Sequence, residues 1–122
     1  MCIRDRSYDG ALLALAADFG SRLLPAFNTP TGLPQAYVNL RSGQLPLAGA
    51  EGQLTCTACA GTLLLEFGAL SALTGDTRFV AAAERAARAL FERRSPIGLV
   101  GGYINVTRCA REGRCMRVHG GW

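Results

Sequence analysis

One carboxylate stands out in the sequence because apolar residues surround it. Glu66 lies in the run from Ala58 to Leu73, where nearly every other residue is small or hydrophobic. A buried, unpaired carboxylate is unfavourable, so it is either hydrogen-bonded inside the core or used in a polar site. Both interpretations stay open: a structural Glu66 bonded to a loop arginine or to backbone, or one that contacts a substrate. Hydrolysis of a sugar bond uses a pair of carboxylates, and no second one accompanies Glu66 at a readable spacing.

Cysteines offer three kinds of chemistry. The "CTAC" pair, Cys56 and Cys59, has the spacing of a thiol–disulfide motif or of zinc ligands. Zinc would need two further ligands from Cys109, Cys115 and His119. Because the pair begins an apolar helix without a βαβ context, the sequence favours structural disulfides in an oxidising compartment. The expected bonds join Cys109 to Cys115, or one of these to Cys56.

Two further polar features lie near the C-terminal end. Asn105 begins "NVT", which is a glycosylation acceptor if the chain is secretory, although a structural role of Asn105 competes with modification. The formal net charge is +4, every basic residue is arginine, and four arginines between 108 and 117 oppose only Glu112. Few aromatic residues and no nucleic-acid motif accompany these arginines, so we expect a solvated basic loop and no nucleic-acid partner.

Three helices would position these residues. Residues 9–24 place Leu12, Ala16, Phe19 and Leu23 at helical spacing, and Pro25 ends the run. Residues 57–74 predict a nearly all-apolar helix that ends at Gly75. Asp76 then caps a third helix over 77–94, whose apolar stripe opposes a charged face. The stripe consists of Phe79, Ala83, Ala86 and Leu90, and the charged face of Arg78, Arg85, Arg88 and Glu92. We expect the apolar helix inside and the amphipathic one outside.

An internal repeat relates the first and third helices with the loops that follow them. "TGLPQAYVNL" at 31–40 matches "IGLVGGYINV" at 97–106, and Gly32 and Gly98 lie 66 residues apart. The same offset continues back through the helices without a gap. The unit is a helix, a Gly-Leu-x-x-x-Tyr-x-Asn loop with a short strand, and a second helix. Such a hairpin cannot bury its apolar face alone, so stacked hairpins in a solenoid or closed ring are expected.

The chain is long enough for one small domain, and no window holds the ~18 consecutive apolar residues of a membrane span. "MCIRDR" fits nothing that follows, so residues 1–7 are expected to be an artefact. Residues 8–122 then form a partial domain, cut from a longer protein, in which 108–121 are an insertion loop. The loop at 28–32 and the start of the 57–74 helix are expected to shape a site where loops gather at the mouth of a ring.

Three segments together resemble glycoside hydrolase family 47, the class I α-1,2-mannosidases, and within it the ER degradation-enhancing α-mannosidase-like branch. They are "LLPAFNTPTGLPQAYVNLRSG", "TCTACAGTLLLEFGALSALTGDTRF" and "ALFERRSPIGLVGGYINV". The resemblance implies an all-α fold, a fragment of an (α/α)7 barrel with short strand-like loops. It also implies Ca²⁺, mannose-rich N-glycans as substrate, and the endoplasmic reticulum, in the lumen or at the membrane. An ER oxidoreductase or a chaperone is a candidate partner.

The family's three catalytic carboxylates and its Ca²⁺-binding Thr are expected outside this chain, so no catalytic or metal residue is assigned within it. Glu66, Asn28, Thr29 and Arg41 are the candidates for substrate contact. Cys59 stands where relatives of this branch usually have Gly. The 108–121 stretch has no clear counterpart in the family.

Two rival functions remain. The same ring without working carboxylates would bind mannose-rich chains as a lectin. A long, open α/α array would instead be a scaffold that binds protein. If the whole sequence contains the three catalytic carboxylates, the enzyme is favoured. If neutral residues stand in their places, the lectin is favoured.

Overall fold

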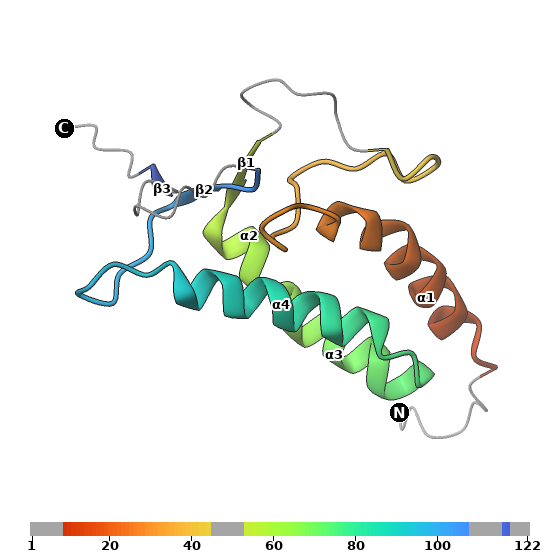
Figure 1. Cartoon of the computed structure of the whole chain (residues 1–122). Coiled ribbons are helices and arrows are strands. Elements are labelled where there is room, and N and C mark those ends of the chain that lie inside the picture. The colour runs from red at the N-terminus through yellow and green to blue at the C-terminus, as the bar shows by residue number, and fades with distance from the viewer. Residues whose placement is uncertain (1–8, 45–52, 108–115, 118–122) are drawn as a thin grey trace, which may run out of the picture.

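The computed structural model describes residues 9–44, 53–107 and 116–117. Helix α1 (Ala11–Leu23) continues into a 3₁₀ turn, η2 (Leu24–Phe27), because Pro25 cannot continue the α-helical ladder. A long connection leads to β1 (Leu54–Cys56), α2 (Thr57–Gly61) and α3 (Leu63–Thr74). Helix α4 (Arg78–Glu92) and the short strands β2 (Tyr103–Asn105) and β3 (Met116–Arg117) follow (Figure 1). The three helical segments predicted from the sequence are confirmed.

Helices α3 and α4 form an antiparallel hairpin around a tight turn (Figure 1). Gly75 ends α3 in the left-handed region, at φ 77°, where glycine carries no side-chain penalty. The Ser71 hydroxyl donates to the Asp76 carbonyl at 2.7 Å and accepts the Val80 N–H at 2.9 Å. Asp76 Oδ1 accepts the N–H of Arg78, the first residue of α4, as a cap would. The turn therefore satisfies backbone groups from both helices.

The core lies where α1 and η2 meet the hairpin. Phe67 of α3 packs against Phe27 in a tilted geometry and against Phe79 edge-to-face, with ring centroids 5.6 Å from each. Gly20 of α1 is buried against the hairpin, and a Cβ added there would lie 2.7 Å from Leu70 Cδ2. The predicted apolar stripe of α4 is confirmed, since all four of its members are buried. The charged face opposite it is exposed, as expected.

The face that α1 buries differs from the prediction. Leu12, Ala16 and Phe19 are exposed, whereas Leu13 and Ala17 pack against the core. Helix α1 is apolar on more than one side, so spacing alone could not identify the buried one. The 66-residue repeat does identify it, because Leu13, Ala17 and Gly20 correspond to the buried residues Phe79, Ala83 and Ala86 of α4.

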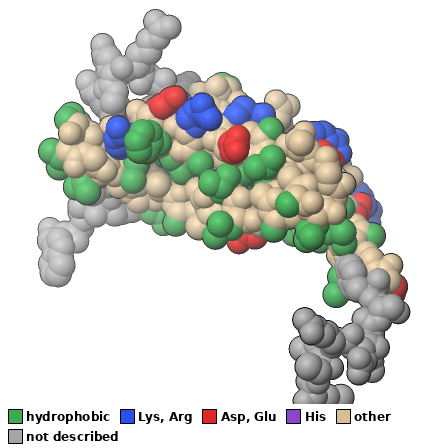
Figure 2. Space-filling view, turned by 90° about the horizontal axis from the view of Figure 1, so that it is seen from below, with side chains coloured by type: hydrophobic (Ala, Val, Ile, Leu, Met, Phe, Trp, Pro, Cys, Tyr) green, Lys and Arg blue, Asp and Glu red, His purple; other side chains and the backbone are tan. Residues whose placement is uncertain are grey.

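Helix α3 lies between α1 and α4, but its remaining face is uncovered. Leu65 is 81% exposed and Leu73 is 69% exposed. The prediction that the apolar helix lies inside therefore holds for only one face of α3 in the described residues. Figure 2 shows hydrophobic side chains gathered on this side of the molecule, beside a row of charged ones.

Thr62, which separates α2 from α3, keeps helical backbone angles, so Thr57–Thr74 also counts as one helix of 18 residues. No membrane span was expected from the sequence, because no window holds enough consecutive apolar residues. By length and by its mean hydropathy of 1.4, however, this helix is apolar enough to cross a membrane. Core helices of folded domains meet the same criterion, but only 17% of this helix is buried within the described residues, with Phe67 and Leu70 among the buried part.

Three short strands form an antiparallel sheet in the order β1-β2-β3. Leu54 pairs with Asn105 and Cys56 with Tyr103, while Tyr103 also pairs with Arg117. The Tyr-Ile-Asn segment of the second repeat, at 103–105, is thus a strand as predicted. Its counterpart at 37–39 is not, because within the described residues nothing pairs with it as β1 pairs with β2.

The repeat is nevertheless visible in the backbone of both loops. Gly32 and Gly98 adopt positive φ angles of 73° and 80°. Each donates its N–H to the carbonyl three residues earlier, on Thr29 and Ser95 respectively. Asn39 and Asn105 each accept, through Oδ1, the N–H two residues later. Corresponding residues therefore make corresponding turns, which confirms the repeat at the level of local structure.

Candidate functional site

The loop that carries Asn28 and Thr29 is held by its own hydrogen bonds. The Thr29 hydroxyl donates to the Leu33 carbonyl at 2.6 Å, and Gln35 N–H donates to the Ala26 carbonyl at 2.9 Å. Leu33 is fully buried and anchors the loop in the core. The exposed Asn28 and half-buried Thr29 are thus presented on a fixed backbone.

A single hydroxyl joins this loop to the second repeat. Thr31 Oγ1 donates to the carbonyl of Val106 at 2.7 Å, across 75 residues of sequence. Val106 is fully buried, and its N–H donates to the Gln53 carbonyl beside β1. The loops of both repeats and the sheet therefore gather at one end of the helices.

Two adjoining hollows lie between this loop and the charged face of α4. The larger has a volume of about 530 Å³ and the smaller about 450 Å³, and both are bordered by Phe27, Asn28 and Arg85. The polar groups that line the larger one come from the loop and from the last turns of α4. They are Asn28, Thr29, Thr31, Arg85, Arg88, Glu92 and Arg93. We call this surface the loop–α4 groove.

The loop–α4 groove is rich in hydrogen-bond donors and carries an excess of positive charge. Arg85, Arg88 and Arg93 face one carboxylate, Glu92. Arg93 also donates to the Ala89 carbonyl at 2.6 Å, which fixes its guanidinium at the end of the helix. Hydroxyl, amide and guanidinium groups can bind a hydroxyl-rich or anionic ligand. A single carboxylate cannot supply both the acid and the base of glycoside hydrolysis.

Sequence reasoning placed Arg85 and Arg88 on a solvated face and missed their place in the groove. The charged face itself was read correctly from the helical period. The helical periodicity of the sequence could not predict the position of the 28–32 loop, because that position depends on the packing of η2 against α4. The clustering of arginines on one face was the only sequence feature that pointed there.

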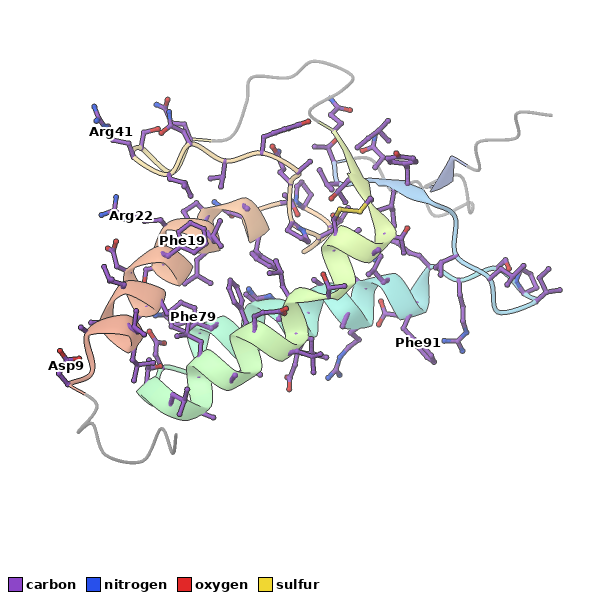
Figure 3. All side chains as sticks on the ribbon, turned by 180° about the vertical axis from the view of Figure 1, so that it is seen from behind. Asp9, Phe19, Arg22, Arg41, Phe79 and Phe91 are labelled. Carbon is purple, nitrogen blue, oxygen red and sulfur yellow. A yellow bond between two sulfur atoms is a disulfide. The ribbon has the colours of Figure 1, made fainter. Side chains whose placement is uncertain are left out.

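The four predicted contact residues do not converge on one site. Asn28 and Thr29 line the loop–α4 groove, but Glu66 and Arg41 do not. Arg41 is exposed in the turn that Asn39 caps, and its side chain extends outward at the same corner as Arg22 (Figure 3). Arg22 ties this turn to α1 by donating to the Leu40 carbonyl at 3.3 Å.

Glu66 is exposed, so the prediction of a carboxylate enclosed by apolar residues is wrong for the described part of the chain. Helix α3 turns Phe67, Leu70 and Ser71 inward, which leaves Glu66 outside that face. Its carboxylate is therefore available to a ligand or to a further part of the protein.

Asn105 has a structural role in the sheet. Its side-chain oxygen accepts the Thr107 N–H at 2.9 Å and the Thr107 hydroxyl at 3.0 Å. Its amide nitrogen donates to Gln53 Oε1 at 3.4 Å. The amide nitrogen, to which a glycan would be attached, takes part in the last of these bonds, and modification of Asn105 stays a prediction.

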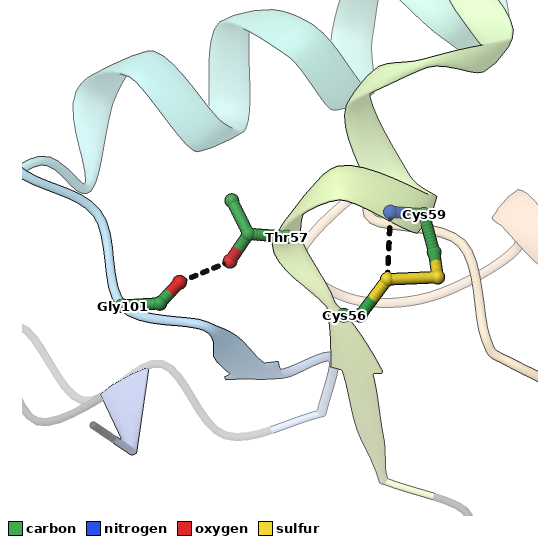
Figure 4. Close-up of a disulfide and its surroundings, with 4 residues drawn as sticks. All are labelled: Cys56, Thr57, Cys59 and Gly101. Carbon is green, nitrogen blue, oxygen red and sulfur yellow. Dashed lines mark hydrogen bonds between the residues drawn. A yellow bond between two sulfur atoms is a disulfide. The ribbon is translucent and has the colours of Figure 1, made fainter. Parts of the chain in front are cut away.

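Cys56 is disulfide-bonded, as predicted, but its partner is Cys59 (Figure 4). The expectation that Cys56 reaches Cys109 or Cys115 is therefore wrong, because residues three apart on the first helical turn are close enough to bond, with Cα atoms 5.0 Å apart. Cys109 and Cys115 lie outside the described residues. The bonded pair is not available as zinc thiolates, and among the described residues there is no group of three or more His, Cys, Asp or Glu that could hold a metal.

Comparison with known proteins yields a consistent set of relatives. The model of the glycosyl hydrolase family 47 matches residues 3–122. The chain is 51% identical over 100 residues to alpha-mannosidase I MNS5 of Arabidopsis thaliana, covering 82% of this chain and 17% of that protein. It is 50% identical over 99 residues to the ER degradation-enhancing alpha-mannosidase-like protein 1 of Schizosaccharomyces pombe, covering 81% of this chain and 12% of that protein.

A more distant relative is the mannosyl-oligosaccharide 1,2-alpha-mannosidase MNS1 of Arabidopsis thaliana, 42% identical over 103 residues, covering 83% of this chain and 18% of that protein. The chain thus spans less than a fifth of the length of these relatives.

Proposed function

Because this chain belongs to glycosyl hydrolase family 47, we propose that it is a segment of an α-1,2-mannosidase that removes terminal α-1,2-linked mannose from N-glycans. The observation that carries the proposal is the family match along residues 3–122, together with about half of the residues identical to named alpha-mannosidases. The α-1,2 linkage is the one in the printed name of the more distant relative.

In the whole protein, the segment supplies one helix–loop–helix unit and the start of the next one in a closed (α/α)7 barrel. The constant 66-residue repeat and the uncovered apolar faces of α1 and α3 support this arrangement, because stacked neighbours would bury those faces. The loops of both repeats gather at one end of the helices, where a mouth would receive a glycan. There the Asn28 amide would donate hydrogen bonds to sugar hydroxyls, and the Thr29 oxygen, whose proton goes to the Leu33 carbonyl, would accept one. Glu66 and Arg41 are further contact candidates.

The hydrolytic carboxylates come from other segments of the whole protein. In an inverting reaction, one carboxylic acid protonates the leaving oxygen and a second carboxylate activates water on the opposite face of the sugar. The segment described here holds and orients the substrate for that reaction. Mannose-rich glycans on glycoproteins are its proposed partners.

Ca²⁺ is part of the proposal for the whole protein. The described residues do not fit such an ion, because a site for calcium needs six to eight oxygen ligands and no cluster of acidic side chains occurs among them. Its ligands would come from elsewhere in the chain.

We propose that the protein acts in the endoplasmic reticulum, where it takes part in the degradation of glycoproteins. The Cys56–Cys59 disulfide is of a kind that persists in oxidising compartments. The name of the Schizosaccharomyces pombe relative points the same way. An ER oxidoreductase or chaperone would then be a natural partner.

The test is the release of mannose from a mannose-rich N-glycan by the purified full-length protein. The proposal predicts release of α-1,2-linked mannose with inverted anomeric configuration, followed by proton NMR, and loss of activity with a chelator that Ca²⁺ restores. The 122-residue chain alone should release none. Glycan binding without release by the full-length protein would support the lectin-like alternative instead, and neither binding nor release would contradict both.

A further inference from the structure

The Cys56–Cys59 disulfide joins residues that the fold already holds together. Cys56 is the last residue of β1 and Cys59 lies in the first turn of α2. The bond closes a loop of sequence separation three. A loop this short removes less entropy from the unfolded chain than a long loop does, so the bond makes only a modest contribution to the stability of the fold.

The backbone around the pair is fixed without the disulfide. Thr57, which follows Cys56, donates its N–H to the Gly102 carbonyl at 3.1 Å and its hydroxyl to the Gly101 carbonyl (Figure 4). Cys56 itself pairs with Tyr103 in the sheet, and the neighbouring Ala60 is buried. Reduction of the bond would therefore leave two thiols at the same place and close to one another.

The two cysteines differ in exposure and in surroundings. Cys59 is exposed, whereas Cys56 is half-buried. The Cys59 N–H donates to Cys56 Sγ at 2.8 Å. A hydrogen bond to sulfur favours the thiolate form, and a thiolate that is stabilised is the better leaving group in thiol–disulfide exchange.

We propose that Cys56 and Cys59 form a thiol–disulfide exchange site that takes electrons from a pair of cysteine thiols on another protein. This activity is separate from glycan hydrolysis and does not rest on the proposed mannosidase function. The Cys-x-x-Cys spacing at the start of a helix is the arrangement that redox-active pairs use. A disulfide with only a structural role would not need an exposed cysteine. It would also not be needed to hold a turn that the Thr57 hydrogen bonds already hold.

The exchange proceeds in two steps. A thiolate of the partner attacks the exposed Cys59 sulfur, which forms a mixed disulfide and releases Cys56 as a thiolate that accepts the Cys59 N–H. The partner's second thiolate then attacks its own sulfur in the mixed disulfide and releases Cys59. The partner's two thiols are oxidised to a disulfide, the Cys56–Cys59 bond is reduced to two thiols, and the two protons pass from the partner to these cysteines.

The first experiment titrates the full-length protein with glutathione at different ratios of reduced to oxidised form. Free thiols are trapped by alkylation, and the peptide that contains both cysteines is analysed by mass spectrometry. We expect the pair to convert reversibly between disulfide and dithiol, while the melting temperature moves by only a few degrees. A disulfide that stays oxidised until denaturant unfolds the protein would overturn the proposal.

The second experiment compares two matched variants, Cys56→Ser and Cys59→Ser, each exposed to oxidised glutathione. We expect Cys56→Ser to accumulate glutathione on Cys59, because the resolving thiol is gone. Cys59→Ser should capture glutathione at least ten times more slowly, because Cys56 is half-buried. Equal capture by both variants would contradict the assigned roles of the two sulfurs. If either variant fails to fold, the titration of the unmodified protein still decides.

Discussion

At the scale of single residues, the carboxylate of Glu66 is the polar group in α3 best placed to meet a ligand. It is exposed among apolar neighbours, and the structure assigns it no role in the fold of the described residues. Leu65 and Leu73 are exposed on the same helix, so one carboxylate does not make this surface polar. Solubility alone therefore explains Glu66 poorly. Glu66, which lies outside the loop–α4 groove, therefore stays a proposed substrate contact that mutation can test.

We predict that Glu66→Gln in the full-length protein lowers mannose release or glycan affinity about tenfold or more, while the melting temperature stays within about 2 °C of the unmodified protein. A hydrogen bond to a charged group contributes about 1.5–3 kcal/mol, which corresponds to a factor of ten or more. Glu84→Gln, on the exposed face of α4, is the matched control and should change neither quantity. Normal kinetics with a lowered melting temperature would assign Glu66 to the fold instead.

Asp76 offers a second test, of the turn that joins α3 to α4. Its side chain pairs with Arg78, with Oδ2 2.6 Å from the guanidinium, and this hydrogen bond holds the pKa of Asp76 below its ordinary value. A lowered pKa in the folded state means that the charged form stabilises the fold above the unfolded pKa of about 3.9, and that this contribution is lost as the pH falls further.

Asp76→Asn should therefore lower the melting temperature slightly at neutral pH and have a smaller effect in acid, below the lowered pKa of Asp76, where the native carboxylate has lost its charge. Asn keeps an oxygen that can accept the Arg78 N–H, so the substitution removes mainly the charge. Thermal unfolding followed by circular dichroism at both pH values measures this. A difference between the two proteins that does not shrink in acid would mean that the charge is not what matters.

At the scale of elements, helix boundaries and turns were predictable because they depend on local chemistry. Pro25 ends α1, Gly75 ends α3, and Asp76 receives the first N–H of α4. The buried face of α1 was not predictable from spacing, because hydrophobic residues occur on several of its sides. Comparison with the repeat would have given it, since the corresponding face of α4 is unambiguous. The groove could not be foreseen, because it forms between a loop and a helix more than 50 residues apart.

The contact between α1 and the hairpin can be tested at Gly20. An alanine Cβ there would lie 2.7 Å from Leu70 Cδ2 and 3.0 Å from Phe79 Cε1. Overpacking of this kind costs about 1–3 kcal/mol, which exceeds the helix-propensity gain of up to about 1 kcal/mol for replacing glycine. We predict that Gly20→Ala lowers the melting temperature of this chain by several degrees.

The matched control is Gly68→Ala in α3, where an added Cβ would meet nothing within 4 Å. This substitution should raise the free energy of unfolding by about 0.5–1 kcal/mol. Opposite shifts of the two variants in urea unfolding would support the packing described. Equal shifts would mean that α1 does not approach the hairpin at Gly20.

At the scale of the whole molecule, the uncovered apolar faces are the feature that the described residues leave unsatisfied. Leu12 and Leu15 of α1 and Leu65 of α3 are each more than 60% exposed. Apolar surface of this extent marks a contact with further protein. Position 12 corresponds to Arg78 in the repeat, so the two units have similar buried faces but different outer ones. That difference fits hairpins that have different neighbours.

Solvent accessibility of these leucines in the full-length protein is the measurement that tests this arrangement most directly. Hydroxyl-radical footprinting, read by mass spectrometry, would compare Leu12, Leu15, Leu65 and Leu73 in the 122-residue chain and in the whole protein. Neighbouring hairpins predict strong oxidation in the chain alone and several-fold weaker oxidation in the whole protein, while Phe91 on the charged side of α4 reacts equally in both. Leucines that react as strongly in the whole protein as in the chain would show that no hairpins cover them, and would contradict the ring.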